Sequence, residues 1–110
     1  MKLFRIEDEE DLWCEYGSAY EAILNLLRNS FTDQEKSKWV LDKAYVNWRR
    51  DSYTVNATFT RFDEVLKDVV MVGCIAEGNR KNELIKTSCG DPIPVEYDCW
   101  KKEYIPKGSV

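Results

Sequence analysis

The sequence of 110 residues contains no histidine. Histidine is the commonest general base near neutral pH, and every Ser–His or Cys–His nucleophile depends on it. The G-x-G-x-x-G and G-x-x-x-x-G-K-[ST] patterns are also missing, which excludes the usual dinucleotide and P-loop phosphate sites. The chain therefore lacks the common signatures of catalysis, and we expect neither an enzyme nor a bound cofactor.

Long apolar segments are missing too. The longest uninterrupted apolar run, residues 69–76, has eight residues, whereas a membrane-spanning helix needs about 20. Residues 1–8 contain no apolar signal region and become acidic at once. We therefore expect no membrane span and a cytoplasmic protein.

The four cysteines show no C-x-x-C spacing. A zinc site would need all four from scattered positions, and a reducing compartment does not call for a stabilising disulfide. We expect Cys74 and Cys99 to pack as small hydrophobic side chains, and Cys14 and Cys89 to be partly exposed thiols. No metal site is predicted.

Several segments have the composition or the period of β-strands. The run at residues 69–76 is rich in β-branched side chains, which predicts a strand buried on both faces in the sheet interior. Residues 53–60 alternate between apolar and polar side chains, which predicts a half-buried antiparallel strand with a threonine-rich open face. Shorter strands are predicted at residues 2–6, at a sheet edge, and at 83–87 and 95–100.

Two capping boxes predict two helices. Ser18 and Glu21 fit the first, and the apolar residues that follow at helical spacing extend it to about Asn29. A second capping box at residues 32–35 opens a predicted helix over about 33–50. The other side of this helix would bring together two lysines, an arginine, a tryptophan and a valine, and it either packs or forms an exposed binding face: Lys36, Trp39, Lys43, Val46 and Arg50.

These elements predict one globular domain over residues 1–110. Its predicted class is α+β, with an antiparallel sheet of four to five strands and two amphipathic helices packed on one face.

Charge is distributed unevenly along the chain. The net charge is −4, yet residues 1–35 carry nine acidic side chains against three basic ones, while residues 36–110 carry eleven against thirteen. The acidic excess includes one uninterrupted run: Glu7, Asp8, Glu9, Glu10 and Asp11. This run is either a solubilising loop or a patch that docks on a basic surface of another protein.

Two functions of different kinds remain. The first is a small acidic protein-binding inhibitor, with the profile of immunity proteins, antitoxins and phage anti-defence proteins, that docks its acidic patch on a basic site of a target and uses Trp13 and Trp39 as aromatic anchors. The second is a binder of a small anionic ligand such as a nucleotide, held by Arg49, Arg50 or Arg80. The acidic balance argues against direct nucleic-acid binding. The oligomeric state stays open.

Overall fold

The computed structural model describes residues 2–6, 9–30, 39–64, 66–79, 81 and 83–107. Within this part of the chain there are one helix and seven strands. In chain order they are β1 (Lys2–Ile6), α1 (Glu9–Ser30), β2 (Val40–Trp48), β3 (Ser52–Asp63), β4 (Asp68–Asn79), β5 (Leu84–Cys89), β6 (Ile93–Asp98) and β7 (Glu103–Pro106).

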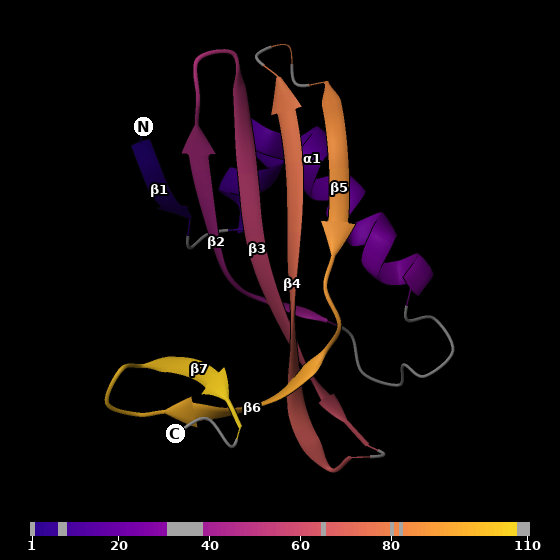
Figure 1. Cartoon of the computed structure of the whole chain (residues 1–110), viewed down its shortest axis with the longest axis vertical. Coiled ribbons are helices and arrows are strands. Elements are labelled where there is room, and N and C mark those ends of the chain that lie inside the picture. Colours follow the sequence, from indigo (N-terminus) through magenta and orange to yellow (C-terminus); the bar gives the residue numbers. More distant parts are fainter. Residues whose placement is uncertain are drawn as a thin grey trace.

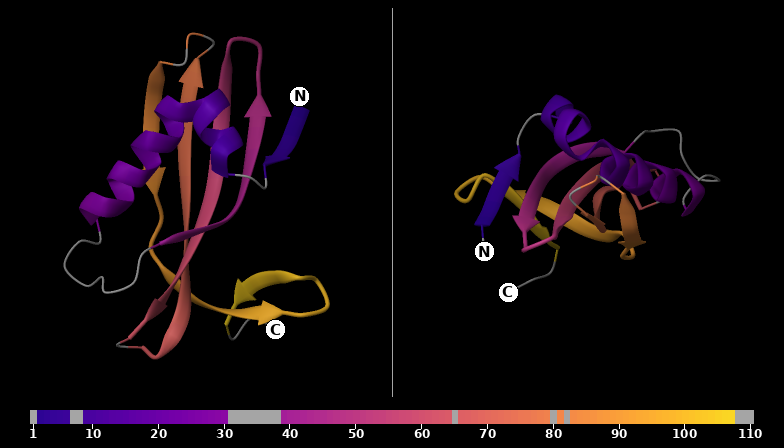
Figure 2. Two further views of the ribbon diagram at one scale, coloured as in Figure 1. Left: turned by 180° about the vertical axis from the view of Figure 1, so that it is seen from behind. Right: turned by 90° about the horizontal axis from the view of Figure 1, so that it is seen from above.

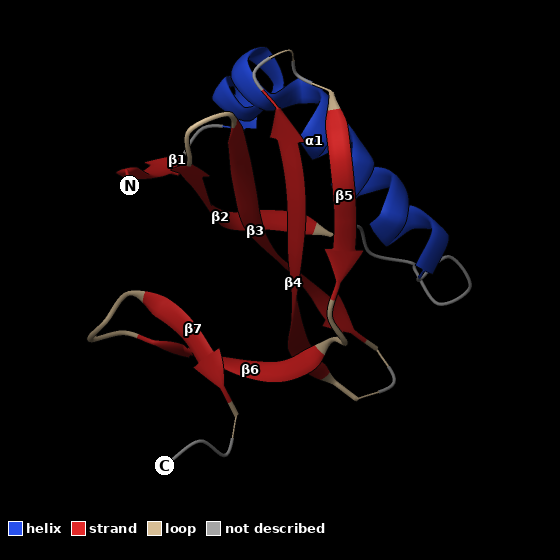
Figure 3. Ribbon diagram, turned by 45° about the horizontal axis from the view of Figure 1, so that its top comes forward, coloured by secondary structure: helices blue, strands red, loops and turns tan. Residues whose placement is uncertain are grey.

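All strand pairs are antiparallel, and the strands follow the order β1-β2-β3-β4-β6-β7, with β5 also paired to β4. The strand β4 therefore has two partners beyond β3. Its residues 74–78 pair with β5, while Val70 and Met71 pair with β6. The sheet is strongly curled, and α1 lies across one face of it (Figure 1 and Figure 3).

The core lies between α1 and the sheet face that it covers. Alternate side chains of β3 and β4 are buried on this face, and β3 contributes the aromatic rings of Tyr53 and Phe59 together with smaller apolar groups. From the helix, Leu12, Tyr20 and Ile23 are almost completely buried. Tyr20 stacks on Phe59 of β3 with ring centroids 6.2 Å apart. This one contiguous cluster holds the helix on the sheet.

The helix changes direction at Tyr16, whose φ of −132° and ψ of 33° are not helical. The two helical segments that result are visible from behind the sheet in Figure 2. Tyr16 is buried beside Trp48 and Tyr53, and the Trp48 indole Nε1–H donates a hydrogen bond to the Tyr16 hydroxyl at 3.0 Å. The kink therefore places an aromatic cluster at the end of β2 and the beginning of β3.

The β6–β7 hairpin lies on the side of the sheet opposite α1 (Figure 2). Two ion pairs tie it to the sheet. Lys43 of β2 lies 3.6 Å from Glu103, and Lys107 donates to Asp68 at 2.5 Å. Val95 is buried, but Trp100 in the hairpin turn is 97% exposed. The hairpin is thus tied to the sheet at its base by Lys107 and beside its turn by Glu103, while Trp100 in the turn faces solvent.

The predicted fold class is wrong in its strand and helix numbers. The part of the chain that the structure describes forms one helix and seven strands in a curled antiparallel sheet, not two helices on four to five strands. The predicted second helix is the error with most effect, because residues 40–48 form β2, which pairs with both β1 and β3. The capping box at residues 32–35 lies outside the described residues.

Other predictions need smaller corrections. The helix begins at Glu9 rather than near residue 18, so it includes part of the acidic run. The strand predicted at residues 69–76 belongs to β4 and is buried on one face rather than on both, because Gly73 and Ile75 are exposed. Cys99 is exposed instead of buried, because it lies in the turn between β6 and β7. The strands at residues 2–6 and 53–60 are confirmed, the latter with its alternation.

Candidate functional site

The acidic run predicted as a docking patch continues into the first turn of α1. Glu9, Glu10 and Asp11 are exposed there, and carboxylates are favourable at a helix N-terminus because they face the unpaired backbone N–H groups. Glu7 and Asp8 lie outside the described residues. The first turn of the helix therefore presents a concentrated negative charge to solvent.

Trp13 lies one turn after Glu9 and is 42% exposed. Its indole Nε1–H points to the Glu9 carboxylate at 3.4 Å, a long contact. The ring packs edge-on against Tyr20, with centroids 5.1 Å apart. Burial raises the pKa of Tyr20 well above its ordinary value, and the Glu9 carboxylate adds to the rise, so the phenol stays neutral and keeps its proton. Trp13 is thus held against the helix surface between a carboxylate and a buried ring.

Trp39, the second predicted anchor, lies in a different environment. It precedes β2 and is partly buried against the core, with the Arg61 guanidinium 4.9 Å from its ring centroid. Arg61 is itself buried and pairs with Asp63 at 3.5 Å. Trp39 therefore covers a buried cation at this end of the core, a different role from that of an exposed tryptophan on α1.

Of the three arginines predicted for an anionic ligand, the structure describes two. Arg49 and Arg50 are exposed in the connection between β2 and β3, where the Arg49 backbone N–H donates to the Ser52 carbonyl at 2.8 Å. Arg80 lies outside the described residues.

A pocket of about 420 Å³ opens on the outer face of the sheet. It forms where β3, β4 and β5 lie side by side and where two glycines, Gly73 and Gly90, leave the backbone uncovered. A Cβ atom built on Gly73 meets nothing within 4 Å. The lining residues are Asn56, Ala57, Thr58, Gly73, Cys74, Ile75, Ser88, Cys89 and Gly90. Cys74 and Cys89 direct their thiols to the core side of the sheet, and the other lining residues hold no group that could transfer a proton near neutral pH.

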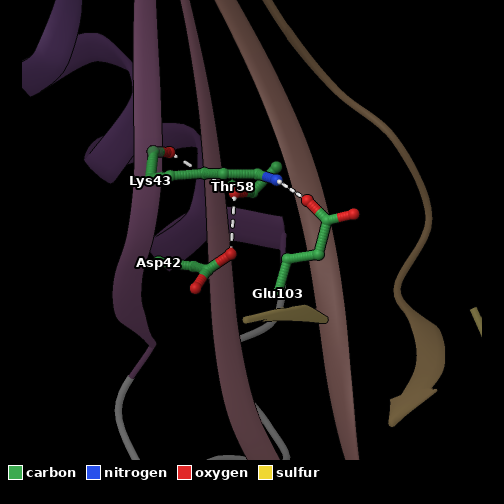
Figure 4. Close-up of polar contacts among 4 residues, drawn as sticks. All are labelled: Asp42, Lys43, Thr58 and Glu103. Atoms are coloured by element: carbon green, nitrogen blue, oxygen red, sulfur yellow. Dashed lines mark hydrogen bonds and ion pairs between the residues drawn. The ribbon is translucent and has the colours of Figure 1, made fainter. Parts of the chain in front are cut away.

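Charged groups lie next to this pocket but pair with each other. Figure 4 shows the Lys43 side chain extending across Thr58 to Glu103. The Thr58 hydroxyl lies 3.3 Å from the Lys43 carbonyl and 3.4 Å from the Asp42 carboxylate, at the bulge where the β2–β3 register shifts. This arrangement joins the hairpin to the sheet and offers no obvious substrate contact.

Two features were not predicted from the sequence. Cys74 and Cys89 face each other across β4 and β5, with their Sγ atoms 2.7 Å apart. Trp100 stands in the β6–β7 turn, where the Asp98 carboxylate accepts hydrogen bonds from the backbone N–H groups of Trp100 and Lys101 at 2.9 and 3.2 Å. Asp98 was the available signal for this turn in the sequence. An aspartate carboxylate favours a turn because it accepts a hydrogen bond from the backbone N–H two residues later.

Among the described residues, no group of three or more Cys, Asp or Glu side chains is placed to hold a metal ion. The helix that the structure describes is not apolar enough to cross a membrane. Comparison of the chain with protein-family models, with curated proteins and with solved structures gives no match.

Proposed function

We propose that this protein is a small protein-binding inhibitor that docks the start of α1 on a basic site of a target protein. The observation that carries the proposal is the combination of three exposed carboxylates with a held, partly exposed tryptophan on two turns of one helix: Glu9, Glu10, Asp11 and Trp13. We call these four residues, which surround the beginning of α1, the acidic helix start.

The two kinds of side chain at the acidic helix start would act at different stages of binding. Exposed carboxylates attract a basic surface over a Debye length of about 8–10 Å and so increase the association rate. An aromatic side chain that fills a pocket contributes mainly to the lifetime of the complex, as tryptophan does at many interface hot spots. Because Trp13 is already packed against Tyr20, little side-chain entropy is lost when a partner covers it.

The alternative function, binding of a small anionic ligand such as a nucleotide, gains no support from the pocket. None of its described lining residues carries a positive charge, and Arg49 and Arg50 lie in an exposed turn. A binding site for phosphate would need cations or several backbone N–H groups directed into one cavity.

The class of target follows from the chemistry of the patch. Basic sites that accept a row of carboxylates are typical of nucleic-acid-processing proteins, because those sites otherwise hold phosphates. We therefore propose that the protein is a cytoplasmic inhibitor of the immunity, antitoxin or phage anti-defence type. Its target would be a nucleic-acid-processing protein, and the inhibitor itself would not bind nucleic acid directly.

The test compares proteins captured from a lysate of the producing cells by immobilised wild-type chain and by three variants. Glu9→Gln/Glu10→Gln/Asp11→Asn removes the negative charge of the acidic helix start, and Trp13→Ala removes its aromatic ring. The matched control neutralises three exposed carboxylates elsewhere and changes the net charge equally: Glu83→Gln/Asp91→Asn/Glu96→Gln.

One dominant protein should be captured by the wild type and by the control but be lost or weakened with both helix variants. With that protein purified, the charge variant should associate about 10-fold or more slowly at low salt and show a flatter salt dependence. Equal capture by all four chains would contradict the proposal. A fifth chain, Arg49→Glu/Arg50→Glu, tests the alternative: loss of the captured protein with this chain and with neither helix variant would also contradict the proposal.

A further inference from the structure

Cys74 and Cys89 are directly opposite each other in the β4–β5 pair. The Gly90 backbone N–H donates to the Gly73 carbonyl at 2.9 Å, a bond that runs between the residues flanking the two cysteines. In an antiparallel pair this pattern identifies Cys74 and Cys89 as a non-hydrogen-bonded pair. At such positions the side chains approach most closely, with Cα atoms about 4.5 Å apart.

This backbone position suits a covalent link. Disulfides join residues whose Cα atoms are about 4.4–6.8 Å apart, with an S–S bond of about 2.05 Å. The two Sγ atoms are already 2.7 Å apart and both side chains lie on the core side of the sheet. Bond formation therefore needs only a small movement of the side chains and no change of strand register.

We propose that Cys74 and Cys89 form a thiol-oxidation site that closes a reversible cross-strand disulfide when it meets a small-molecule disulfide such as oxidised glutathione. In the first step the Cys89 thiolate attacks one sulfur of the oxidant, forms a mixed disulfide and releases one thiol. In the second step the Cys74 thiolate attacks Cys89 Sγ and releases the other. Two protein thiols are oxidised, one disulfide is reduced to two thiols, and the two protons pass to those thiols.

The order of the steps follows from the positions of the two cysteines. Cys89 is the last residue of β5, pairs with β4 alone among the described strands, and is only partly buried. Cys74 is 1% exposed beneath the helix. Burial raises the pKa of both thiols, but a hydrogen bond from Cys74 acts in the opposite direction on Cys89. Cys89 is therefore the thiol that a reagent reaches and that ionises first, and Cys74 resolves the mixed disulfide.

The test uses a Cys14→Ser/Cys99→Ser background, which removes both exposed thiols. The folded protein is incubated with oxidised glutathione at about pH 8, close to the ordinary cysteine pKa. Its intact mass should fall by two hydrogen atoms without a bound glutathione, and a non-reducing peptide map should link Cys74 to Cys89. The thermal midpoint should rise by about 10 °C and return on reduction, because the link closes a loop of 15 residues.

A control variant moves the thiol by one residue. In the same background, Cys89→Ser/Ser88→Cys places it beside Ile75 on the outer face of the sheet, away from Cys74. This variant should gain a glutathione adduct and form no intramolecular disulfide. The proposal is overturned if the variant closes a disulfide as readily as the parent. It is also overturned if the folded parent binds two glutathiones or keeps both thiols while the urea-unfolded parent reacts.

Discussion

Replacing Gly78 of β4 by alanine should destabilise the fold, because the ring of Tyr53 occupies the space where a side chain would lie. A Cβ atom at this position would be 2.5 Å from the Tyr53 hydroxyl oxygen and 2.6 Å from Cζ. The ring cannot easily move aside. It is 2% exposed, with its centroid 4.9 Å from that of Tyr16 and 5.2 Å from that of Trp48.

The magnitude comes from three contributions. Overpacking a filled core costs about 1–3 kcal/mol. Displacing the Tyr53 ring also weakens its contacts with Tyr16 and Trp48, and such aromatic pairs contribute about 0.5–1.5 kcal/mol each. Alanine returns about 0.5–1 kcal/mol, because glycine loses more conformational freedom on folding. The net loss in the free energy of unfolding should be about 2 kcal/mol.

Urea unfolding followed by tryptophan fluorescence measures this loss, since Trp48 belongs to the affected cluster. Gly73→Ala is the matched control, because it lies in the same strand and its Cβ would meet nothing within 4 Å. That variant should be unchanged or more stable by up to about 1 kcal/mol.

A double-mutant cycle identifies the cause. In a Tyr53→Leu background the aromatic ring is gone, so adding Gly78→Ala should cost much less than it does in the wild type. The steric explanation is refuted if Gly78→Ala costs the same with and without the Tyr53 ring. It is equally refuted if Gly78→Ala is as harmless as Gly73→Ala.

The remaining predictions concern β4 and its contact with the C-terminal segment. Val72→Asp should prevent soluble expression of folded protein, because it buries an unpaired carboxylate at a site that is 1% exposed, whereas Ile75→Asp on the outer face should fold. The hydrogen bond from Lys107 lowers the pKa of Asp68, so this contact stabilises the fold above the unfolded-state pKa of about 3.9 and is lost as pH falls through the lower folded-state value. Lys107→Met should therefore raise the Asp68 pKa in an NMR titration and flatten the acid side of the stability profile; an unshifted titration would contradict this.

The sequence predicted strands well where the alternation had one interpretation. Residues 53–60 contain apolar side chains only at odd positions, so a strand was the clear choice. Residues 40–48 were ambiguous, because the spacing of Val40, Ala44 and Trp48 is a multiple of two and also nearly one helical turn. Pairing with both β1 and β3 decides in favour of the strand, and such long-range contacts do not appear in the local pattern.

The candidate sites differ in the same way. The acidic helix start could be predicted in part, because its charged residues and Trp13 are neighbours in the sequence. The Cys74–Cys89 pair could not, since it depends on the β4–β5 register, and a shift of one residue would place the two side chains on opposite faces. The sequence predicts a strand that continues to Trp100, whereas β6 ends at Asp98 and Trp100 lies in the turn that follows.

The order of the strands has a consequence for folding during synthesis. The strands β3 and β4 pair at twelve positions across a connection of only residues 64–67, so this hairpin closes with little loss of chain entropy. The strand β1 is synthesised before this hairpin, yet its partner among the described strands is β2, more than thirty residues later. Until β2 is synthesised, the backbone groups of β1 stay unpaired, and the exposed charge of Arg5 lowers the risk of pairing with another nascent chain.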